Sequence, residues 1–227
     1  MSIYMIPLII HQVYGVFDDG RPLSDIPVYF NQVQKTINYC TKNNISYKMW
    51  NSTMCNDLVN KYPQYRGLYD NFKHKIMKAD FIRYLILYDE GGLYVDCDIC
   101  PIGDLSDLFK NDEFFVYWSN DKNKKPYNAV LGSLPSSPLY VDILEHLETS
   151  YYEKLKNPTY ERWIGRFVFQ TTGHHMLQRV LKNHPYVKRL DILKINAKGG
   201  EIISDKCPLF EDFNASIWYN NGNQMYS

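Results

Sequence analysis

The chain has 227 residues, of which 45% are hydrophobic and 22% charged, so a packed domain is expected and general disorder is excluded. Lysine plus arginine and aspartate plus glutamate number 25 each, which argues against a general nucleic-acid binder, because such proteins carry a basic excess or stripe. The five cysteines, an odd number, indicate reduced thiols in a cytosol-like compartment. The sequence shows no signal peptide and no integral membrane segment, so a cytoplasmic protein is expected.

The first third of the chain alternates strand-like and helix-like segments. A buried strand is expected at 7–10, then a helix over 28–43, and a second strand over 46–50. A further helix is stopped by Pro63. His11, directly after the first strand, is expected to be an ordinary core histidine.

The rest of the chain continues the alternation. Helices are predicted over 75–89, 138–156 and 173–183, and strands over 93–99, 114–118, 128–133 and 187–195, before an irregular tail. This order predicts an α/β fold with a mostly parallel central sheet, flanking helices and a ligand at the carboxyl ends of the strands. We expect a single domain over 1–227, with a ligand-binding core at about 6–133 and a closing part at about 134–227.

The segment KADFIRYLILYDEGGLYVDCDI (78–99) is mostly apolar, so its charged side chains are expected to be buried and to need partners. Buried charges cost several kcal/mol unless they are paired or bound to a metal. Asp80 and Arg83 are three residues apart and leave the same face of the predicted helix. They form either an internal ion pair or part of a binding site.

Side chains alternate along the predicted strand 93–99, so Asp96 and Asp98 are expected on the same side, with Cys97 opposite. The repulsion between two neighbouring carboxylates is best relieved by a divalent metal that prefers oxygen ligands, Mn²⁺ or Mg²⁺. Substrate phosphates would complete the coordination shell of this metal. Cys97 and Cys100 form a C-x-x-C within the strand-like run LYVDCDIC, where buried thiols are favoured over a redox or zinc pair. An aspartyl-phosphate phosphohydrolase also uses D-x-D, but its motif usually ends the first strand of the domain.

At these residues the chain resembles the glycosyltransferases with a D-x-D sugar-binding region, glycosyltransferase family 32. That family includes fungal Golgi mannosyltransferases, bacterial capsule enzymes and, distantly, clostridial glucosylating toxins. Its hallmark is matched here by Lys78, Asp80, Arg83, Tyr84, Leu87, Gly91, Gly92, Tyr94, Asp96 and Asp98. The opening IPLIIHQVYG also resembles the family's first strand. The resemblance implies a Rossmann-like nucleotide-sugar-binding domain of glycosyltransferase A type.

The resemblance also implies roles for single residues. Asp80, Arg83, Asp96 and Asp98 would be the catalytic set, in which the first three bind the donor sugar. Asp98, with Asp96, would hold the metal. The other donor-binding positions implied are Gln12, Tyr14, Asn128 and Gly173. Related enzymes often place a histidine near the end of the chain, and this tail has none, so the third metal ligand stays open among Asn220, Asn221 and Asn223.

The reaction implied is metal-dependent transfer of a sugar, with retained configuration, from a nucleotide diphosphate sugar to a glycan, lipid or protein acceptor. A UDP-sugar is favoured over GDP-mannose. The absence of an anchor before the first strand favours an enzyme of a bacterial cell or a virus-infected host cell. The alternative is a nucleotide-sugar or glycan-binding protein that is weakly active or inactive, because both the tail and the loop TTGHH (171–175) depart from the family pattern.

Overall fold

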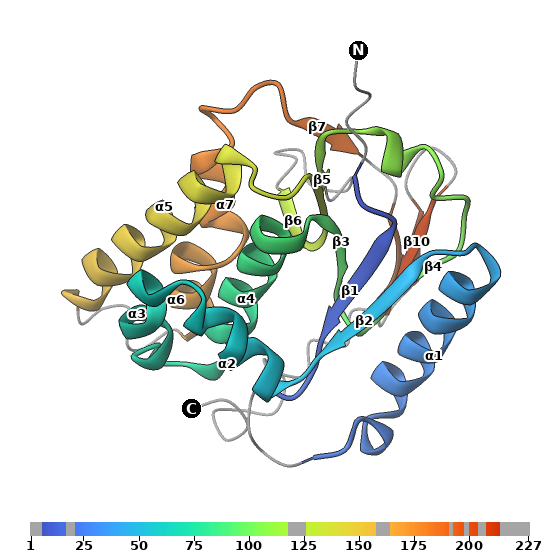
Figure 1. Ribbon diagram of the computed structural model, residues 1–227, viewed down its shortest axis with the longest axis horizontal. Helices are drawn as coiled ribbons and strands as arrows, with labels where there is room; N and C mark the ends of the chain where they lie inside the picture. The colour runs from blue at the N-terminus through green and yellow to red at the C-terminus, as the bar shows by residue number, and fades with distance from the viewer. Residues whose placement is uncertain are drawn as a thin grey trace.

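The computed structural model describes residues 6–16, 21–117, 126–157, 164–190, 193–197, 200–203 and 208–213. A six-stranded sheet of order β2-β1-β3-β6-β5-β7 forms its centre (Figure 1). Its strands are β1 (Ile9–Val13), β2 (Ser46–Trp50), β3 (Gly92–Val95), β5 (Glu113–Tyr117), β6 (Pro126–Ser133) and β7 (Lys188–Leu190). Strand β6 runs antiparallel to both of its neighbours, and the other pairings are parallel. The predicted mostly parallel α/β sheet is therefore confirmed.

Helices cover both faces of this sheet (Figure 1). The helices are α1 (Pro27–Lys42), α2 (Ser52–Asn60), α3 (Arg66–Asp70), α4 (Lys75–Glu90), α5 (Pro138–Leu155), α6 (Ile164–Thr171) and α7 (His174–Val180). Side chains alternate along β3, so Leu93 and Val95 face a cluster that includes Cys40 of α1, whereas Tyr94 faces the larger cluster built by α2 to α7. The sheet thus separates two hydrophobic cores.

Local signals in the sequence explain where several helices begin and end. Pro27 and Pro138 open α1 and α5, since proline suits the first helical turn. The side chain of Asn51 caps α2 by accepting a hydrogen bond from the Met54 N–H at 2.9 Å. Gly91 follows the end of α4 with a φ of 67°, which fits the glycine pair that the sequence analysis places there.

The turn from α4 into β3 requires glycine for two reasons. Gly91 and Gly92 have φ values of 67° and 91°, which favour residues without a Cβ. A Cβ on Gly92 would also lie 2.6 Å from Ile9 Cγ2, and one on Gly91 would lie 2.7 Å from Pro135 Cδ. The close approach lets β3 leave α4 directly beside β1.

A second, four-stranded sheet of order β4-β10-β8-β9 was not predicted. Its strands are β4 (Ile99–Pro101), β8 (Leu193–Ala197), β9 (Gly200–Ile203) and β10 (Phe210–Asp212). The predicted strands 93–99 and 187–195 are each split between the two sheets, so their straight course is wrong. Helix α6 was also missed, and the predicted helix 173–183 is the shorter α7.

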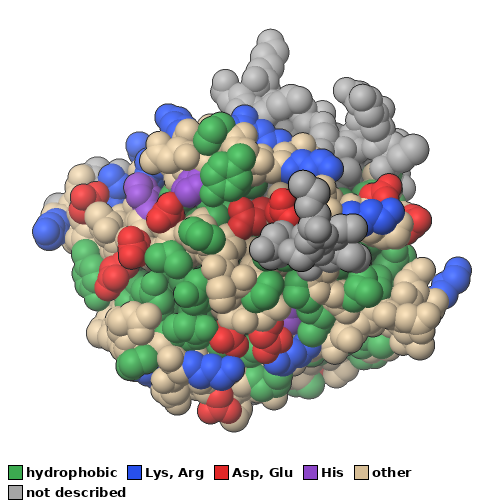
Figure 2. Space-filling model, turned by 45° about the horizontal axis from the view of Figure 1, so that its top comes forward, with side chains coloured by type: hydrophobic (Ala, Val, Ile, Leu, Met, Phe, Trp, Pro, Cys, Tyr) green, Lys and Arg blue, Asp and Glu red, His purple; other side chains and the backbone are tan. Residues whose placement is uncertain are grey.

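Within the described ranges, the helices are too short or too polar to cross a lipid bilayer. Charged and hydrophobic side chains are intermingled over the described part of the face shown in Figure 2. The division into a part at 6–133 and a part at 134–227 stays a prediction.

Candidate active site

Helix α4 places two buried charges beside the central sheet. Asp80 and Arg83 are each 4% exposed, and Arg83 Nη2 lies 3.0 Å from Asp80 Oδ1. The Asn128 amide donates to the same Asp80 oxygen at 2.9 Å, and the Thr172 hydroxyl donates to Oδ2 at 2.7 Å. The predicted same-face pair exists, and segments far apart in the sequence complete its hydrogen bonds.

Arg83 joins this helix to the end of β3. Its Nη1 atom lies 3.3 Å from Asp96 Oδ1 and donates to the Asn128 carbonyl at 2.7 Å. The Tyr94 hydroxyl donates to the same Asp96 oxygen at 2.6 Å, and the guanidinium carbon lies 4.9 Å from the centre of the Tyr94 ring. Each buried charge therefore has an opposite charge and further hydrogen bonds, as burial requires.

Burial and charge pairing act in opposite directions on the ionisation of these groups. Burial raises the pKa of Asp80 and of Asp96, and the Arg83 guanidinium opposes both shifts. Burial by itself would lower the pKa of Arg83, but the Asp96 carboxylate, together with Tyr94 and Asp80, raises it. The arginine thus remains a fixed positive charge between two carboxylates.

The D-x-D residues occupy a turn, not the straight strand that the sequence analysis expected. Strand β3 ends at Val95, and the Ile99 N–H donates to the Asp96 carbonyl at 3.0 Å, which closes the turn. The chain bends here because Ile99 begins β4 of the second sheet. The side chain of Asp96 is 29% exposed and Asp98 is half-buried.

Hydrogen bonds of the Gln12, Tyr47 and Cys97 side chains support this turn on its buried side. The Gln12 amide nitrogen donates to the Asp96 carbonyl at 3.1 Å, and the Gln12 amide oxygen accepts from the Tyr47 hydroxyl at 2.9 Å. Cys97 is buried and its thiol donates to the Val13 carbonyl at 3.3 Å. Gln12 is fully buried, so it supports the turn from the protein side. The thiol of Cys97 has the same structural function.

His11 is a satisfied core histidine, as predicted. Trp50 Nε1 donates to Nδ1 of His11 at 3.1 Å, so the ring hydrogen lies on Nε2, which donates to the Gly91 carbonyl at 3.0 Å. Burial lowers the pKa of His11 to about 3. The ring is therefore neutral and joins β1 and β2 to the turn after α4.

The remaining predicted residues lie at the ends of elements. Tyr14 follows β1, is half-buried, and donates its hydroxyl to the Arg21 carbonyl at 2.8 Å. Gly173 separates α6 from α7, directly after the Thr172 that binds Asp80. The tail asparagines Asn220, Asn221 and Asn223 lie outside the described residues.

The donor atoms at the turn suit a hard divalent cation. Asp96 and Asp98 supply carboxylate oxygens, the ligands that Mg²⁺ and Mn²⁺ prefer. Among the described residues, no group of three or more histidine, cysteine, aspartate or glutamate side chains is arranged to hold a metal by itself. Two carboxylates fit such a cation if diphosphate oxygens and water complete its shell, which is the usual mode for Mg²⁺.

Sequence reasoning missed three groups near the site. Thr172 lies in the loop TTGHH, in which only Gly173 was predicted to belong to the site. Tyr127 on β6 and Asp212 on β10 form a hydrogen bond of 2.7 Å, and Asp212 is 1% exposed. The available signal was a polar residue within an otherwise apolar segment, and that signal does not identify a partner 85 residues away.

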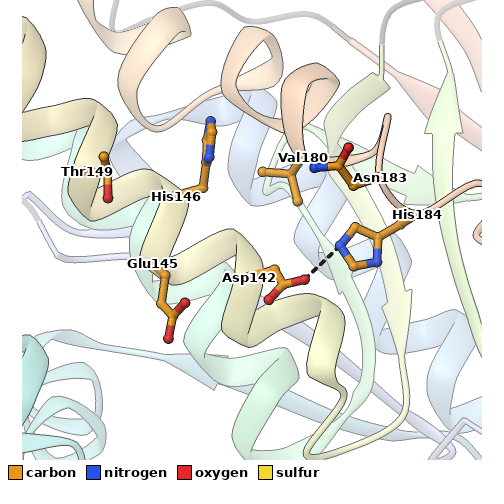
Figure 3. Close-up of a pocket in the computed structure, with 7 residues that line it drawn as sticks. All are labelled: Asp142, Glu145, His146, Thr149, Val180, Asn183 and His184. Carbon is orange, nitrogen blue, oxygen red and sulfur yellow. Dashed lines mark ion pairs between the residues drawn. The ribbon is translucent and has the colours of Figure 1, made fainter.

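A separate pocket lies between α5 and the segment at and after the end of α7, and Figure 3 shows the side chains that line it. Its volume is about 300 Å³. His184 Nε2 and Asp142 Oδ2 form an ion pair of 2.9 Å across it. Its lining residues are Asp142, Glu145, His146, Thr149, Val180, Asn183 and His184. None of these belongs to the predicted site.

Residues 29–115 match the model of a family described as "glycosyltransferase sugar-binding region containing DXD motif". An uncharacterized glycosyltransferase of Acanthamoeba polyphaga mimivirus is 36% identical over 146 residues, which cover 63% of this chain and 56% of that protein. The mannosyl phosphorylinositol ceramide synthase SUR1 of Saccharomyces cerevisiae is 30% identical over 153 residues, covering 66% of this chain and 36% of that protein. The chain thus spans about half or less of the length of these relatives.

A solved structure, the PaToxG glycosyltransferase, superposes with a TM-score of 0.51 at 14% identity and covers 79% of this chain and 70% of its own. This likeness supports the glycosyltransferase A fold. The family match spans both α4, with Asp80 and Arg83, and the turn with Asp96 and Asp98. This segment of the chain is therefore similar to the glycosyltransferase sugar-binding regions that contain a DXD motif.

Proposed function

We propose that the protein is a metal-dependent, retaining glycosyltransferase that moves a sugar from a nucleotide diphosphate sugar to an acceptor hydroxyl. The observation that carries this proposal is the buried Asp80–Arg83–Asp96 network, which ends in a partly exposed carboxylate. That carboxylate lies at the carboxyl end of β3, beside β1, where ligands bind in open α/β sheets. The family match and the relatives support the same activity.

Asp96 and Asp98 are the residues that would hold Mn²⁺ or Mg²⁺. Such a cation, when bound, would stabilise negative charge on the departing diphosphate. Tyr14 would lie beside the nucleotide base, and Gly173 would let its loop approach the donor. The third protein ligand, if the tail provides one, would be an amide oxygen of Asn220, Asn221 or Asn223.

Asp80, Arg83 and Asn128 would bind and orient the donor sugar. Asp80 and Arg83 expose 6% and 5% of their side chains, so they would reach a sugar hydroxyl only at a small accessible edge. Their larger contribution would be to hold the Asp96 carboxylate, whose side chain is 29% exposed, in one position. A preformed constellation lowers the entropic part of the barrier, because the reacting groups are already oriented.

The transfer itself would be a same-face displacement. The bond from the anomeric carbon to the diphosphate oxygen breaks, the bond to the acceptor oxygen forms, and the acceptor proton passes to the departing diphosphate. The transition state would resemble an oxocarbenium ion. This path is proposed because Asp80, Asp96 and Asp98 are assigned to donor and metal binding, which leaves none of them to act as a covalent nucleophile.

The names of the yeast relatives favour mannose as the first sugar to test, beside the UDP-sugars expected from the sequence. The phosphorylinositol ceramide in these names also favours a lipid acceptor. A cytoplasmic location in a bacterial cell or an infected host cell stays a prediction.

The test is a nucleotide-release assay with UDP-glucose, UDP-galactose, UDP-N-acetylglucosamine and GDP-mannose, in Mn²⁺ or in EDTA. We expect release from one donor in Mn²⁺ only, and its loss in Asp98→Ala. Asp57→Ala, which removes an exposed carboxylate from α2, is the matched control and should keep full activity. Release that survives in Asp98→Ala would contradict the proposal. Thermal stabilisation by a donor without release would instead support the alternative, a nucleotide-sugar-binding protein.

A further inference from the structure

The last described strand, β10, contributes a buried carboxylate next to a residue that binds the D-x-D turn. Asp212 is 1% exposed, and its Oδ2 atom accepts a hydrogen bond of 2.7 Å from the Tyr127 hydroxyl. Tyr127 precedes Asn128 on β6, whose amide and carbonyl bind Asp80 and Arg83. The Asp212–Tyr127 bond therefore joins β10 to the strand that supports the donor side of the site.

The backbone of β10 holds the other end of the same turn. Asp212 pairs with Ile99 in the antiparallel β4–β10 ladder of the second sheet. The Phe213 N–H then donates to the carbonyl of Asp98 itself at 3.1 Å. Lys35 of α1 lies 5.0 Å from the centre of the Phe213 ring and anchors this strand end further. The residue that follows Asp212 thus hydrogen-bonds the backbone of Asp98.

Burial and the neighbouring carboxylates keep the Tyr127 hydroxyl protonated, so that it can donate this hydrogen bond. Burial is the main cause that raises the pKa of Tyr127 well above its usual value, and the nearby carboxylates of Asp212, Asp98 and Asp96 raise it further. The phenol therefore keeps its proton and remains a donor.

We propose that Asp212 and Tyr127 are positioning residues, which fix the Asp98 end of the D-x-D turn so that it can bind a divalent cation. The inference rests on the proposed metal-dependent function and extends it to two residues outside the motif. Groups that orient metal ligands in this way typically change metal affinity by about 10- to 100-fold when they are removed. Neither residue needs to contact the cation or the donor for this effect.

The test measures Mn²⁺ binding directly, by electron paramagnetic resonance of free Mn²⁺ in a titration without donor. Tyr127→Phe removes only the hydroxyl and should raise the Kd about tenfold. Asp212→Ala should have a similar effect, and the double variant should be no weaker than the single ones, since all three lose the same hydrogen bond. Thermal unfolding of each variant checks that it is folded at the assay temperature.

Tyr62→Phe is the matched control. The Tyr62 hydroxyl also donates to a carboxylate at 2.7 Å, that of Asp89, and this pair is absent from the network around the turn. A purely structural role predicts similar losses of stability in both tyrosine variants and no change in Kd for either. A Kd for Tyr127→Phe within twofold of the wild type, or additive effects in the double variant, would overturn the inference. If the wild type binds Mn²⁺ only when UDP or GDP is present, the variants are compared in that mixture. If it binds no Mn²⁺ there either, the proposed metal dependence fails first, and the inference fails with it.

Discussion

The hydrogen bond from Thr172 to Asp80 gives the sharpest test of the buried network. The substitution Thr172→Val keeps the shape of the side chain and removes its hydroxyl. Thr172 is fully buried, so water is not available to replace the donor, and one oxygen of Asp80 loses its partner. Arg83 and Asn128 still bind the other oxygen.

The expected cost follows from the nature of this bond. Hydrogen bonds to charged groups contribute roughly 1.5 to 3 kcal/mol to the free energy of unfolding. Because valine fills almost the same space, a cavity adds little to the loss. For a protein of this size, 1 kcal/mol changes the melting temperature by about 2 to 4 °C. We therefore expect the melting temperature of Thr172→Val to fall by roughly 3 to 12 °C.

The assay is thermal unfolding at neutral pH, with Thr36→Val as the comparison. Thr36 is also fully buried, but its hydroxyl donates only to the carbonyl of Gln32 in its own helix, at 3.0 Å. Such a local bond contributes little, so Thr36→Val should cost less than about 1 kcal/mol. If the two variants unfold at the same temperature, Thr172 does not stabilise the Asp80 carboxylate and the reasoning is refuted.

Two further variants test the glycine turn and a buried acid. Gly92→Ala should lower the free energy of unfolding by more than about 1 kcal/mol, because φ is positive and the new Cβ would meet Ile9. Gly67→Ala, with open space around the new Cβ, should be neutral or stabilising. Equal melting temperatures of the two variants would contradict this reasoning. Burial, with a smaller contribution from Asp112, raises the pKa of Glu113 from 4.5 to about 7. The stability that the protonated acid contributes is therefore complete below pH 4.5 and is lost as the pH rises through 7. Glu113→Gln should therefore unfold at a higher temperature than the wild type at pH 8 but not at pH 4, and the same difference at both pH values would exclude this titration.

The sequence predicted the parts of the site that depend on local pattern. Asp80 and Arg83 meet because three residues along a helix return to the same face, and the glycine pair was recognisable because only glycine suits that turn. The straight strand through Asp96 and Asp98 was wrong, since alternation within a strand cannot reveal that the chain moves to another sheet at Ile99.

The missed parts depend on distant segments. Thr172 lies 92 residues from the carboxylate that it binds, and no spacing rule connects the two. The second sheet was missed for the same reason, because β4 and β10 each contain only three residues and carry little periodicity. Short strands are specified by their partners more than by their own sequence.

The pairing of β4 with β10 has a consequence for the order in which the protein folds. The two strands are roughly a hundred residues apart in the sequence, and contacts of such separation form slowly, because the chain between them must be ordered first. Helix α4 and its turn into β3 need only neighbouring residues, so they can form early. The backbone of Asp98 receives its bond from Phe213 only when the last described strand has docked. Binding competence should therefore appear later during refolding than most of the secondary structure.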